Sequence, residues 1–323
     1  MNVRELFFYY VSRYQQEKNR VFGNSLNYRY NKEDMSKDAN LHRVAIAIHP
    51  KMAGVHELAE QVHTFLSDKG VNACVCHTDD ASLPDQLANN MFDLMITVGG
   101  DGTMLRAGHL TASAGVPLLG INMGRFGFLM QLGRDNWQDF LPRLLQGDYQ
   151  IENRMMLKAD HWRKGNLLAS FQVINEVVVC RGQVVRPIRI HTEVDGYSLA
   201  SYVADGIIAA TPTGSTAYAL AVGGPIMPPE LRNILIVPVA PHLSMDRAVI
   251  LPAGASVDIQ SNSDHQAVMS VDGHAPVLLK NDDHVKVTAS DYFVKFVMFQ
   301  DPGYFYRNLS TYMEQNPSIG GLK

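Results

Sequence analysis

The sequence has few cysteines, little excess charge and no long hydrophobic run. Only three of its 323 residues are cysteines, and the spacing of Cys74 and Cys76 matches neither a paired zinc site nor a redox dithiol. The formal net charge of −4 provides no electrostatic footprint for nucleic acid or an anionic membrane. No apolar stretch reaches bilayer-spanning length, and residues 7–11 are too short an apolar run for a signal peptide. These absences favour a cytoplasmic protein with no nucleic-acid and no membrane partner.

Two common nucleotide-binding motifs are also missing. No Gly-Lys-Ser/Thr phosphate loop occurs in the chain. The segment that begins at Gly100 has Leu105 where the dinucleotide fingerprint requires its third glycine. A phosphate-binding site in this chain must therefore be built from a different loop.

The first half of the chain has the pattern of an α/β domain. Its 46% hydrophobic content and its length are sufficient for two domains. Apolar runs at 43–48, 72–76, 94–98 and 117–121 alternate with helical periodicity over 58–66, 83–90 and 103–114. This alternation predicts a doubly wound parallel α/β domain over residues 41–150.

After residue 150 the pattern changes to short runs with period-two alternation. Strands are predicted at 171–179, 186–194, 207–210, 234–240, 256–260, 267–271, 284–288 and 292–299. They predict a β-rich domain over residues 151–300, arranged as layers or a sandwich, followed by a helix and tail over 301–323. Residues 1–40 are interpreted as an extension: a docked helix, a disordered arm, or an artefact of start-site choice with Met35 as the true start.

The most informative segment is Gly-Gly-Asp-Gly-Thr at residues 99–103. It follows the apolar run 94–98, which reads as a buried parallel strand, and ligands bind beyond the carboxyl ends of such strands. The glycines leave their N–H groups accessible, and the N-terminus of the following helix favours anions. Phosphate is therefore the expected ligand. Asp101 would repel phosphate unless it handles a proton, a hydroxyl or a metal ion. The alternative is a tight turn in which Asp101 caps a helix beginning near Thr103.

A second ligand-facing turn is predicted after Asp205. The short apolar strand 207–210 leads into a hydroxyl-rich turn and a small-residue helix at residues 211–221, closed by glycines at 223–224. Hydroxyls and free N–H groups at a helix start can satisfy the polar edges of a nucleotide. The alternative is that Thr213, Ser215 and Thr216 only cap the helix.

Asn175 and Glu176 interrupt an apolar strand pattern. Neighbouring residues of a regular strand point to opposite faces, so one of the two would be buried in the core. An unpartnered buried carboxylate costs several kcal/mol, roughly. Either a bulge presents both side chains to a ligand, or the pair holds two domains together.

Other polar positions carry weaker signals. Residues 120–129 follow the next strand and are expected to line the same crevice as Asp101, where Phe128 could cover a ring; the alternative is that this segment only packs the domain junction. Arg106, one helical turn beyond Thr103, either reaches a phosphate or is a solvated surface arginine. The segment 270–274, which contains Asp272, reads first as a hairpin turn, and structural roles are expected for His109, His191 and His242. No metal-ligating residues are predicted from spacing.

The content and order of these segments resemble the NAD kinase family. The resemblance is carried by Gly99-Gly100-Asp101-Gly102-Thr103, by Asn175-Glu176, by Asp205-Gly206 with residues 211–218, by residues 223–226, and by Asp272-Gly273. It extends from about residue 43 to residue 310. It implies an enzyme that transfers the ATP γ-phosphate to the 2'-hydroxyl of the adenosine ribose of NAD, giving NADP. It further implies a magnesium requirement, an α/β domain followed by a β-rich domain, and homodimers or homotetramers.

The same resemblance implies roles for individual residues. Asp101 corresponds to the family's proton acceptor. Positions that contact NAD are matched by Asp101, Gly102, Asn175, Glu176, Asp205, Thr216, Ala217, Tyr218, Ala219, Leu220 and Ala221. Arg106 and Arg186 align with positions that vary among relatives, and His274 stands where some members have glutamine.

Two other functions remain open at this point. A lipid or sugar kinase shares the Gly-Gly-Asp-Gly turn but would not use NAD as acceptor. A non-catalytic sensor would bind NAD without nucleotide turnover.

Overall fold

The computed structural model describes residues 41–49, 52–124, 127–242, 245–263, 265–300 and 303–315. The predicted extension at residues 1–40 and the tail beyond residue 315 lie outside these ranges. Among the described helices, none combines the length and the apolar character needed to cross a bilayer.

The first half is a parallel α/β layer, as predicted. Its strands lie in the order β4-β3-β1-β2, and they pair in parallel. Their bounds are β1 (Arg43–Ile48), β2 (Asn72–His77), β3 (Leu94–Gly99) and β4 (Leu118–Asn122), with the two-residue β5 (Leu132–Gly133) beside β4. The helices are α2 (Val55–Asp68), α3 (Leu83–Ala88), α4 (Asp101–Thr111) and α5 (Trp137–Leu145).

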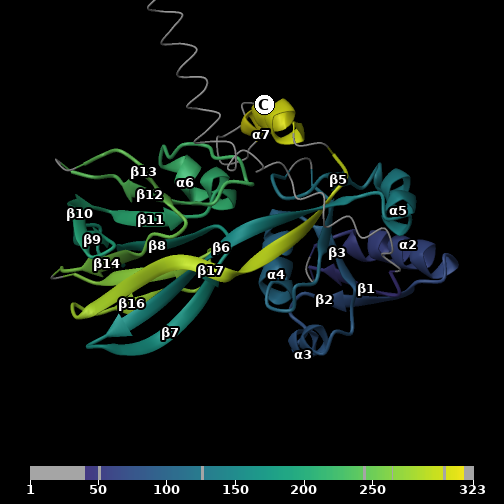
Figure 1. The fold of residues 1–323 in the computed structure, drawn as a ribbon, viewed down its shortest axis with the longest axis horizontal. Coiled ribbons are helices and arrows are strands. Elements are labelled where there is room, and N and C mark those ends of the chain that lie inside the picture. Colours follow the sequence, from purple (N-terminus) through teal and green to yellow (C-terminus); the bar gives the residue numbers. More distant parts are fainter. Residues whose placement is uncertain are drawn as a thin grey trace, which may run out of the picture. The chain divides into compact units, whose positions relative to one another are not determined.

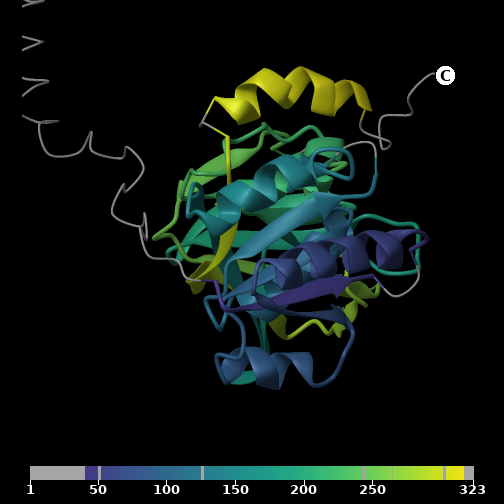
Figure 2. The ribbon, with the colours of Figure 1, turned by 90° about the vertical axis from the view of Figure 1, so that its right-hand side faces the viewer.

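Helices cover both faces of this parallel sheet. Even-numbered residues of β1 such as Ile46 pack with α2 and α5, whereas Ala45 and Ala47 pack with α3 and α4. Figure 2, which faces this half, shows α2 in purple and α3 in blue on opposite sides of the strands. Burial on both faces explains why β1, β3 and β4 are apolar runs without alternation, whereas the edge strand β2 is partly exposed.

The second half is a β sandwich. One layer is the antiparallel part of an 11-stranded sheet, formed by β6 (Gln150–Arg163), β7 (Asn166–Val173), β9 (Ile188–Val194), β10 (Tyr197–Ala204), β14 (Val257–Ser261) and β17 (Asp283–Met298). The other is a six-stranded sheet in the order β13-β12-β11-β8-β15-β16. Its strands are β8 (Glu176–Arg181), β11 (Gly206–Ala210), β12 (Asn233–Val239), β13 (Val249–Pro252), β15 (Ala267–Val271) and β16 (Val277–Leu279). The predicted combination of a doubly wound α/β half with a layered β-rich half is confirmed.

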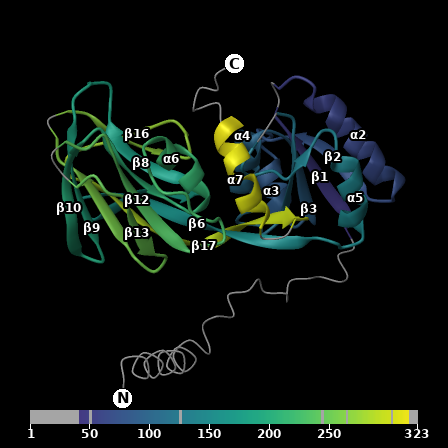
Figure 3. The same cartoon turned by 90° about the horizontal axis from the view of Figure 1, so that it is seen from above.

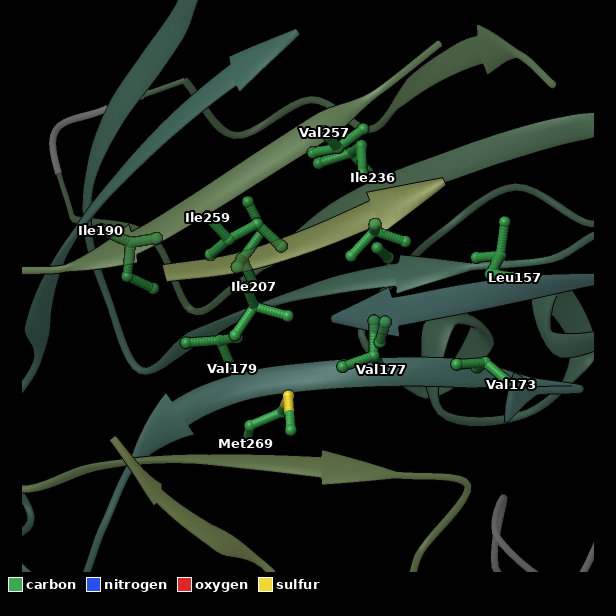
Figure 4. Packing of buried hydrophobic residues seen from close by; sticks show 14 of the residues in the cluster. Leu157, Val173, Val177, Val179, Ile190, Ile207, Ile236, Val257, Ile259 and Met269 are labelled. Carbon is green, nitrogen blue, oxygen red and sulfur yellow. The ribbon is translucent and has the colours of Figure 1, made fainter. Parts of the chain in front are cut away.

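The core of the sandwich lies between the two sheets. Val177, Val179 and Ile207 of the six-stranded sheet face Ile190 and Ile259 of the larger one (Figure 4). Along β11 the alternate residues Ile208 and Ala210 point to the outer face, where Ala219 and Met227 cover them. The covering element is the 3-10 helix η2 (Thr213–Thr216) followed by α6 (Tyr218–Ala221). The helix α7 (Tyr304–Gln315) follows β17, as expected for the C-terminal segment.

The two halves share one continuous sheet. β17 pairs antiparallel with β6 from Asp283 to Met298, and its Phe296 also pairs in parallel with Leu118 of β4. Figures 1 and 3 show β6 and the yellow β17 running together from the sandwich to the α/β half. A boundary at residue 150 therefore falls at the first residue of β6, and the stretch 151–300 includes the strand that joins the halves.

Several predicted elements have different bounds. The run 171–179 is two strands, because the chain leaves one sheet at Val173 and enters the other at Glu176. The predicted strands at 284–288 and 292–299 are the single β17, whose pairing is irregular between Ala289 and Phe293. β5, β6, β10, β13, β16 and α5 were not predicted. In β6, Glu152 and Arg154 break the apolar pattern, yet both are buried because they bond to each other at 2.6 Å.

Candidate active site

Asp101 is the first residue of α4, directly after β3. Gly100 is the N-cap in an extended conformation, and no side chain caps the helix. The helix therefore begins two residues earlier than predicted. The alternative in which Asp101 caps a helix starting near Thr103 is wrong, since its carboxylate bonds elsewhere. Gly102 beside it is exposed, and an added Cβ there would meet nothing within 4 Å.

The Asp101 carboxylate holds the segment that follows β4. Oδ2 accepts the Phe128 N–H at 2.8 Å, and Oδ1 accepts the Leu129 N–H at 3.3 Å. Gly127 packs so closely that a Cβ on it would lie 3.0 Å from the Asp101 Cγ and overlap Oδ1. Of the stretch 120–129, residues 127–129 contact Asp101, and residues 125–126 lie outside the described ranges. Within the described part of the chain these two bonds leave two of the roughly four lone-pair positions of the carboxylate for another donor.

Burial makes Asp101 a stronger base than an ordinary aspartate. Desolvation is the largest cause and raises its pKa above the usual value, while the Phe128 and Leu129 N–H groups and the charge of Arg154 oppose it. Arg154 is itself buried on β6, where its guanidinium bonds to Glu152 and lies 4.5 Å from the centroid of the Phe296 ring. A buried cation on β6 therefore acts on the carboxylate at the head of α4.

Asn175 and Glu176 lie where the chain passes between the two sheets. Ile174 and Asn175 form a corner between β7 and β8, and Glu176 is the first residue of β8. The regular strand that would force one side chain into the core is therefore absent from this segment. Asn175 is half-buried and Glu176 is buried. We call residues 174–176 the corner.

The corner is bonded from both sides. On one side the Asp272 carboxylate accepts the N–H groups of Ile174, Asn175 and Glu176 at 2.7, 2.8 and 2.9 Å. On the other side the hydroxyl and N–H of Thr211 donate to the carbonyls of Ile174 and Asn175 at 2.6 and 2.8 Å. These bonds satisfy the polar backbone of the corner, which would otherwise be costly to bury.

The hydroxyl-rich turn packs directly on the corner. Gly214 leaves no room for a side chain, because a Cβ there would lie 2.7 Å from the Cα of Asn175 and overlap its carbonyl. Ser215 is buried and bonds to Pro212 and Met227, so its hydroxyl has an internal role. Thr216 is half-buried and donates to the Thr213 carbonyl at 3.1 Å.

The Glu176 carboxyl is buried at the start of α6. Only 7% of the residue is exposed, and within the described part of the chain Oε2 has no hydrogen-bond partner. Burial, followed by the negative charge of Asp272, raises its pKa to about 8, although the Tyr218 N–H partly opposes this. A buried oxygen without a partner is costly, and a ligand donor would offset that cost.

Tyr218 experiences the charges of carboxylates near both ends of β8, Glu176 at its start and Asp205 near its end. Asp205 precedes β11 and pairs with Arg181 at 3.1 Å, about 17 Å along the strand from Glu176. Burial is the largest cause that raises the pKa of the Tyr218 phenol, and the charges of Asp205, Arg181 and Glu176 also act on it. The charges of both carboxylates therefore act on the half-exposed Tyr218 phenol.

The remaining predicted residues lie at more exposed positions. Arg106 is exposed on α4, and Arg186 is exposed between β8 and β9. His274 is exposed in the β15–β16 turn, with its ring 5.4 Å from that of His109. Ala217 and Leu220 are half-buried, Ala219 is buried and Ala221 is exposed. None of the described residues gathers into a group of three or more His, Cys, Asp or Glu that could hold a metal ion.

Two residues of the site carried only weak sequence signals. Asp272 occupies the predicted hairpin turn, but its carboxylate is fully buried and bonds to residues almost 100 positions away. His109 on α4 shares that carboxylate at 2.8 Å. The usable signal was Asp272-Gly273 directly after an apolar strand, but the partner segment is not deducible from a hairpin pattern.

Two family models match the chain in sequence order. The one described as ATP-NAD kinase N-terminal domain matches residues 77–149, and the one described as ATP-NAD kinase C-terminal domain matches residues 174–299. The NAD kinase of Dehalococcoides mccartyi (strain CBDB1) is 33% identical over 277 residues, which cover 85% of this chain and 96% of the relative. The NAD kinase of Chloroflexus aurantiacus (strain ATCC 29366) is 34% identical over 269 residues, covering 83% and 97%.

Solved structures share the fold. Yeast NADH kinase complexed with NADH superposes with a TM-score of 0.74 at 24% identity, covering 88% of this chain and 91% of that chain. An NAD kinase from Archaeoglobus fulgidus in complex with ATP gives a TM-score of 0.68 at 25% identity, covering 86% and 100%.

Together with the family models and relatives, the Gly-Gly-Asp-Gly turn at the head of α4 identifies the chain as a phosphotransferase. The chain belongs to the NAD kinase family. The function predicted from the sequence, an NAD kinase, is confirmed at this level.

Proposed function

We propose that this protein transfers the γ-phosphate of ATP to the 2'-hydroxyl of the adenosine ribose of NAD, with Asp101 as the group that holds and deprotonates that hydroxyl. The observation that supports this is the Asp101 carboxylate, fixed by two N–H groups at the head of α4 and raised in pKa by burial. The relatives of this chain are NAD kinases, and one solved relative is an NAD kinase in complex with ATP.

Asp101 needs only a modest chemical role. Phosphoryl transfer has a loose transition state, so most of the acceleration comes from aligning donor and acceptor. A carboxylate with free lone pairs accepts the ribose hydroxyl and takes its proton as the new O–P bond forms, while the bond from the γ-phosphorus to the bridging oxygen breaks and ADP leaves. The raised pKa of Asp101 brings it closer to the working pH, which favours proton transfer.

The NAD side of the site is proposed to be the corner and its neighbours. Asn175, the buried Glu176 carboxyl, and the segment from Thr216 to Ala221 lie together around the start of α6. The Glu176 Oε2, which has no partner in the described residues, is suited to accept a ribose hydroxyl. Asp205, Arg186 and His274 extend the proposed NAD surface, and Gly102 and Arg106 are proposed to contact phosphates.

Magnesium is proposed to enter with ATP. The described residues form no cage for a resident ion. Magnesium commonly keeps several waters and is held through substrate phosphates with one or two carboxylates. Bound in this way it offsets the charge of the triphosphate beside Asp101.

The cellular form is proposed to be a cytoplasmic homodimer or homotetramer that acts on small molecules alone, without nucleic acid or membrane. Large apolar side chains on two of the edge strands support assembly, since Tyr197 of β10 and Ile250 of β13 are 80% and 51% exposed. Light scattering of the purified chain tests the oligomer.

One assay tests the reaction. Purified protein is incubated with NAD, ATP and magnesium, and NADP is detected with a dehydrogenase that requires it. NADP formation supports the proposal. ATP consumption that depends on a lipid or sugar phosphate and ignores NAD would identify one of the other kinases, and NAD binding without turnover would identify a sensor.

A further inference from the structure

Asp272 is bonded to two separate parts of the site. Its side chain is fully buried, and its carboxylate accepts four hydrogen bonds, three from the corner and one from His109 Nε2 at 2.8 Å. Four bonds use about all the acceptor capacity of a carboxylate. Asp272 has a positive φ of 48°, and its own N–H donates to the Glu176 carbonyl at 3.0 Å. An aspartate in this backbone conformation is held there by its surroundings.

His109 connects this carboxylate to the helix that carries Asp101. It lies on α4 eight residues after Asp101, about 12 Å along the helix axis. The adjacent Gly108 packs against the corner, since a Cβ there would lie 2.8 Å from the Ile174 Cδ1. The C-terminal part of α4 is therefore fixed to the corner directly by the packing of Gly108, and indirectly by the hydrogen bond from His109 to Asp272.

We propose that His109 and Asp272 are positioning residues for phosphoryl transfer, coupling the helix that presents Asp101 to the corner that presents Asn175 and Glu176. The inference rests on the proposed function, in which Asp101 handles the acceptor hydroxyl and the corner binds NAD. Neither His109 nor Asp272 touches the reacting atoms in this scheme. Their bond sets the separation between the two sides of the site.

The arrangement makes the effect of each residue separable. The three bonds from Asp272 to the corner do not involve His109, so removing the His109 donor leaves the corner bonded. The same removal releases α4 from the corner at its polar contact. Small displacements of a catalytic group reduce turnover strongly while leaving substrate binding intact. A positioning role therefore predicts a change in kcat without a matching change in KM for NAD.

The test compares His109→Leu, which removes the donor, with His109→Gln, whose amide N–H reaches a similar position. His109→Leu is expected to lower kcat roughly 10- to 100-fold with KM for NAD within about twofold of the wild type. His109→Gln is expected to recover most of the turnover.

The chain contains a matched control. His161 Nε2 bonds to the buried Asp283 carboxylate at 2.7 Å on β6 and β17, and both side chains are at least as buried as those of His109 and Asp272. His161→Leu removes the same kind of bond and is expected to lower the melting temperature while kcat stays within about twofold.

The outcomes separate the inference from the function. Wild-type protein that makes no NADP refutes the proposed function. If the wild type is active, the positioning role is refuted by a His109→Leu kcat equal to the wild type, by equal losses in His109→Leu and His109→Gln, or by an equal loss in His161→Leu. A His109→Leu protein that fails to fold under conditions where His161→Leu folds would assign the bond to stability alone and would also overturn the inference.

Discussion

Asp101 and Gly127 are in direct contact, although 26 positions separate them in the sequence. A methyl group on the glycine would overlap the Asp101 Oδ1 and lie 3.0 Å from Cγ. The neighbouring Phe128 and Leu129 donate their N–H groups to the same carboxylate. The orientation of the proposed proton acceptor is therefore set by a segment outside the Gly-Gly-Asp-Gly turn.

Replacing Asp101 by Asn should abolish most turnover. Asp101→Asn removes the negative charge and the base while keeping size, so kcat is expected to fall by about a hundredfold or more, with NAD affinity retained. Steady-state kinetics and NAD titration measure both.

Asp93 supplies the control for this substitution, because its carboxylate also holds two backbone N–H groups, those of His42 and Arg43 at 3.0 and 2.9 Å. Asp93→Asn should leave kcat unchanged. Wild-type turnover in Asp101→Asn would remove Asp101 from the mechanism.

Adding a methyl group at Gly127 should displace the Asp101 carboxylate without changing its chemistry. Gly127→Ala is expected to lower kcat roughly tenfold, because misplacement of a catalytic group is costly. Gly133→Ala is the matched control in the same region, since a Cβ at Gly133 meets nothing within 4 Å. Equal kcat values for the two variants would show that the carboxylate tolerates displacement.

Adding a methyl group at Gly214 should separate the hydroxyl-rich turn from the corner. The Cβ would press on the backbone of Asn175, which cannot move as a flexible side chain does. Gly214→Ala is expected to raise KM for NAD and to lower the unfolding free energy by about 1–3 kcal/mol. The control is Gly254→Ala, where the added Cβ meets nothing within 4 Å. An unchanged KM in folded Gly214→Ala would detach this turn from NAD binding.

Glu176 should make stability fall as the pH rises. Its pKa is about 8 in the folded chain against an ordinary value of 4.5, so between these values the folded state keeps a proton that the unfolded state releases. The unfolding free energy contributed by Glu176 is therefore highest below about pH 4.5 and decreases until the pH passes about 8.

Glu176→Gln removes this titration. Its unfolding free energy at pH 9 is expected to exceed that of the wild type by roughly 1–3 kcal/mol, with a smaller difference at pH 5. Urea denaturation at both pH values measures it. A parallel pH dependence in the two proteins would mean that the Glu176 carboxyl ionises in the folded state as it does in water.

Strands β1, β3 and β4 of the α/β half were predictable because their residues are buried on both faces. The runs at 43–48 and 94–98 are almost entirely apolar, so their burial does not depend on a polar partner elsewhere in the chain. They match β1 and β3 closely. Strand β6 was not predicted, for the opposite reason. Its Glu152 and Arg154 look like surface residues, and only their mutual bond explains their burial.

The identity of the candidate site was predictable, but its internal connections were not. Glycines around Asp101 and the polar pair Asn175-Glu176 each break a local pattern, so each was visible in the sequence. Asp272 obeys its local pattern, a turn between two strands, and its role depends on N–H groups from the distant corner. The hydrogen bonds and packing around Asp101 and the corner show which predicted residues lie together. The roles of these residues in NAD binding stay predictions.

The long pair of strands β6 and β17 restricts how this enzyme can move. These strands pair from Asp283 with Arg163 to Met298 with Gln150, and Phe296 of β17 also pairs with Leu118 of β4. Rotating one half against the other would require bending the β6–β17 strand pair and breaking backbone hydrogen bonds between the two strands. Protease digestion of the folded chain should accordingly release no separate halves, and any adjustment to bound nucleotides falls to the segments at the ends of strands.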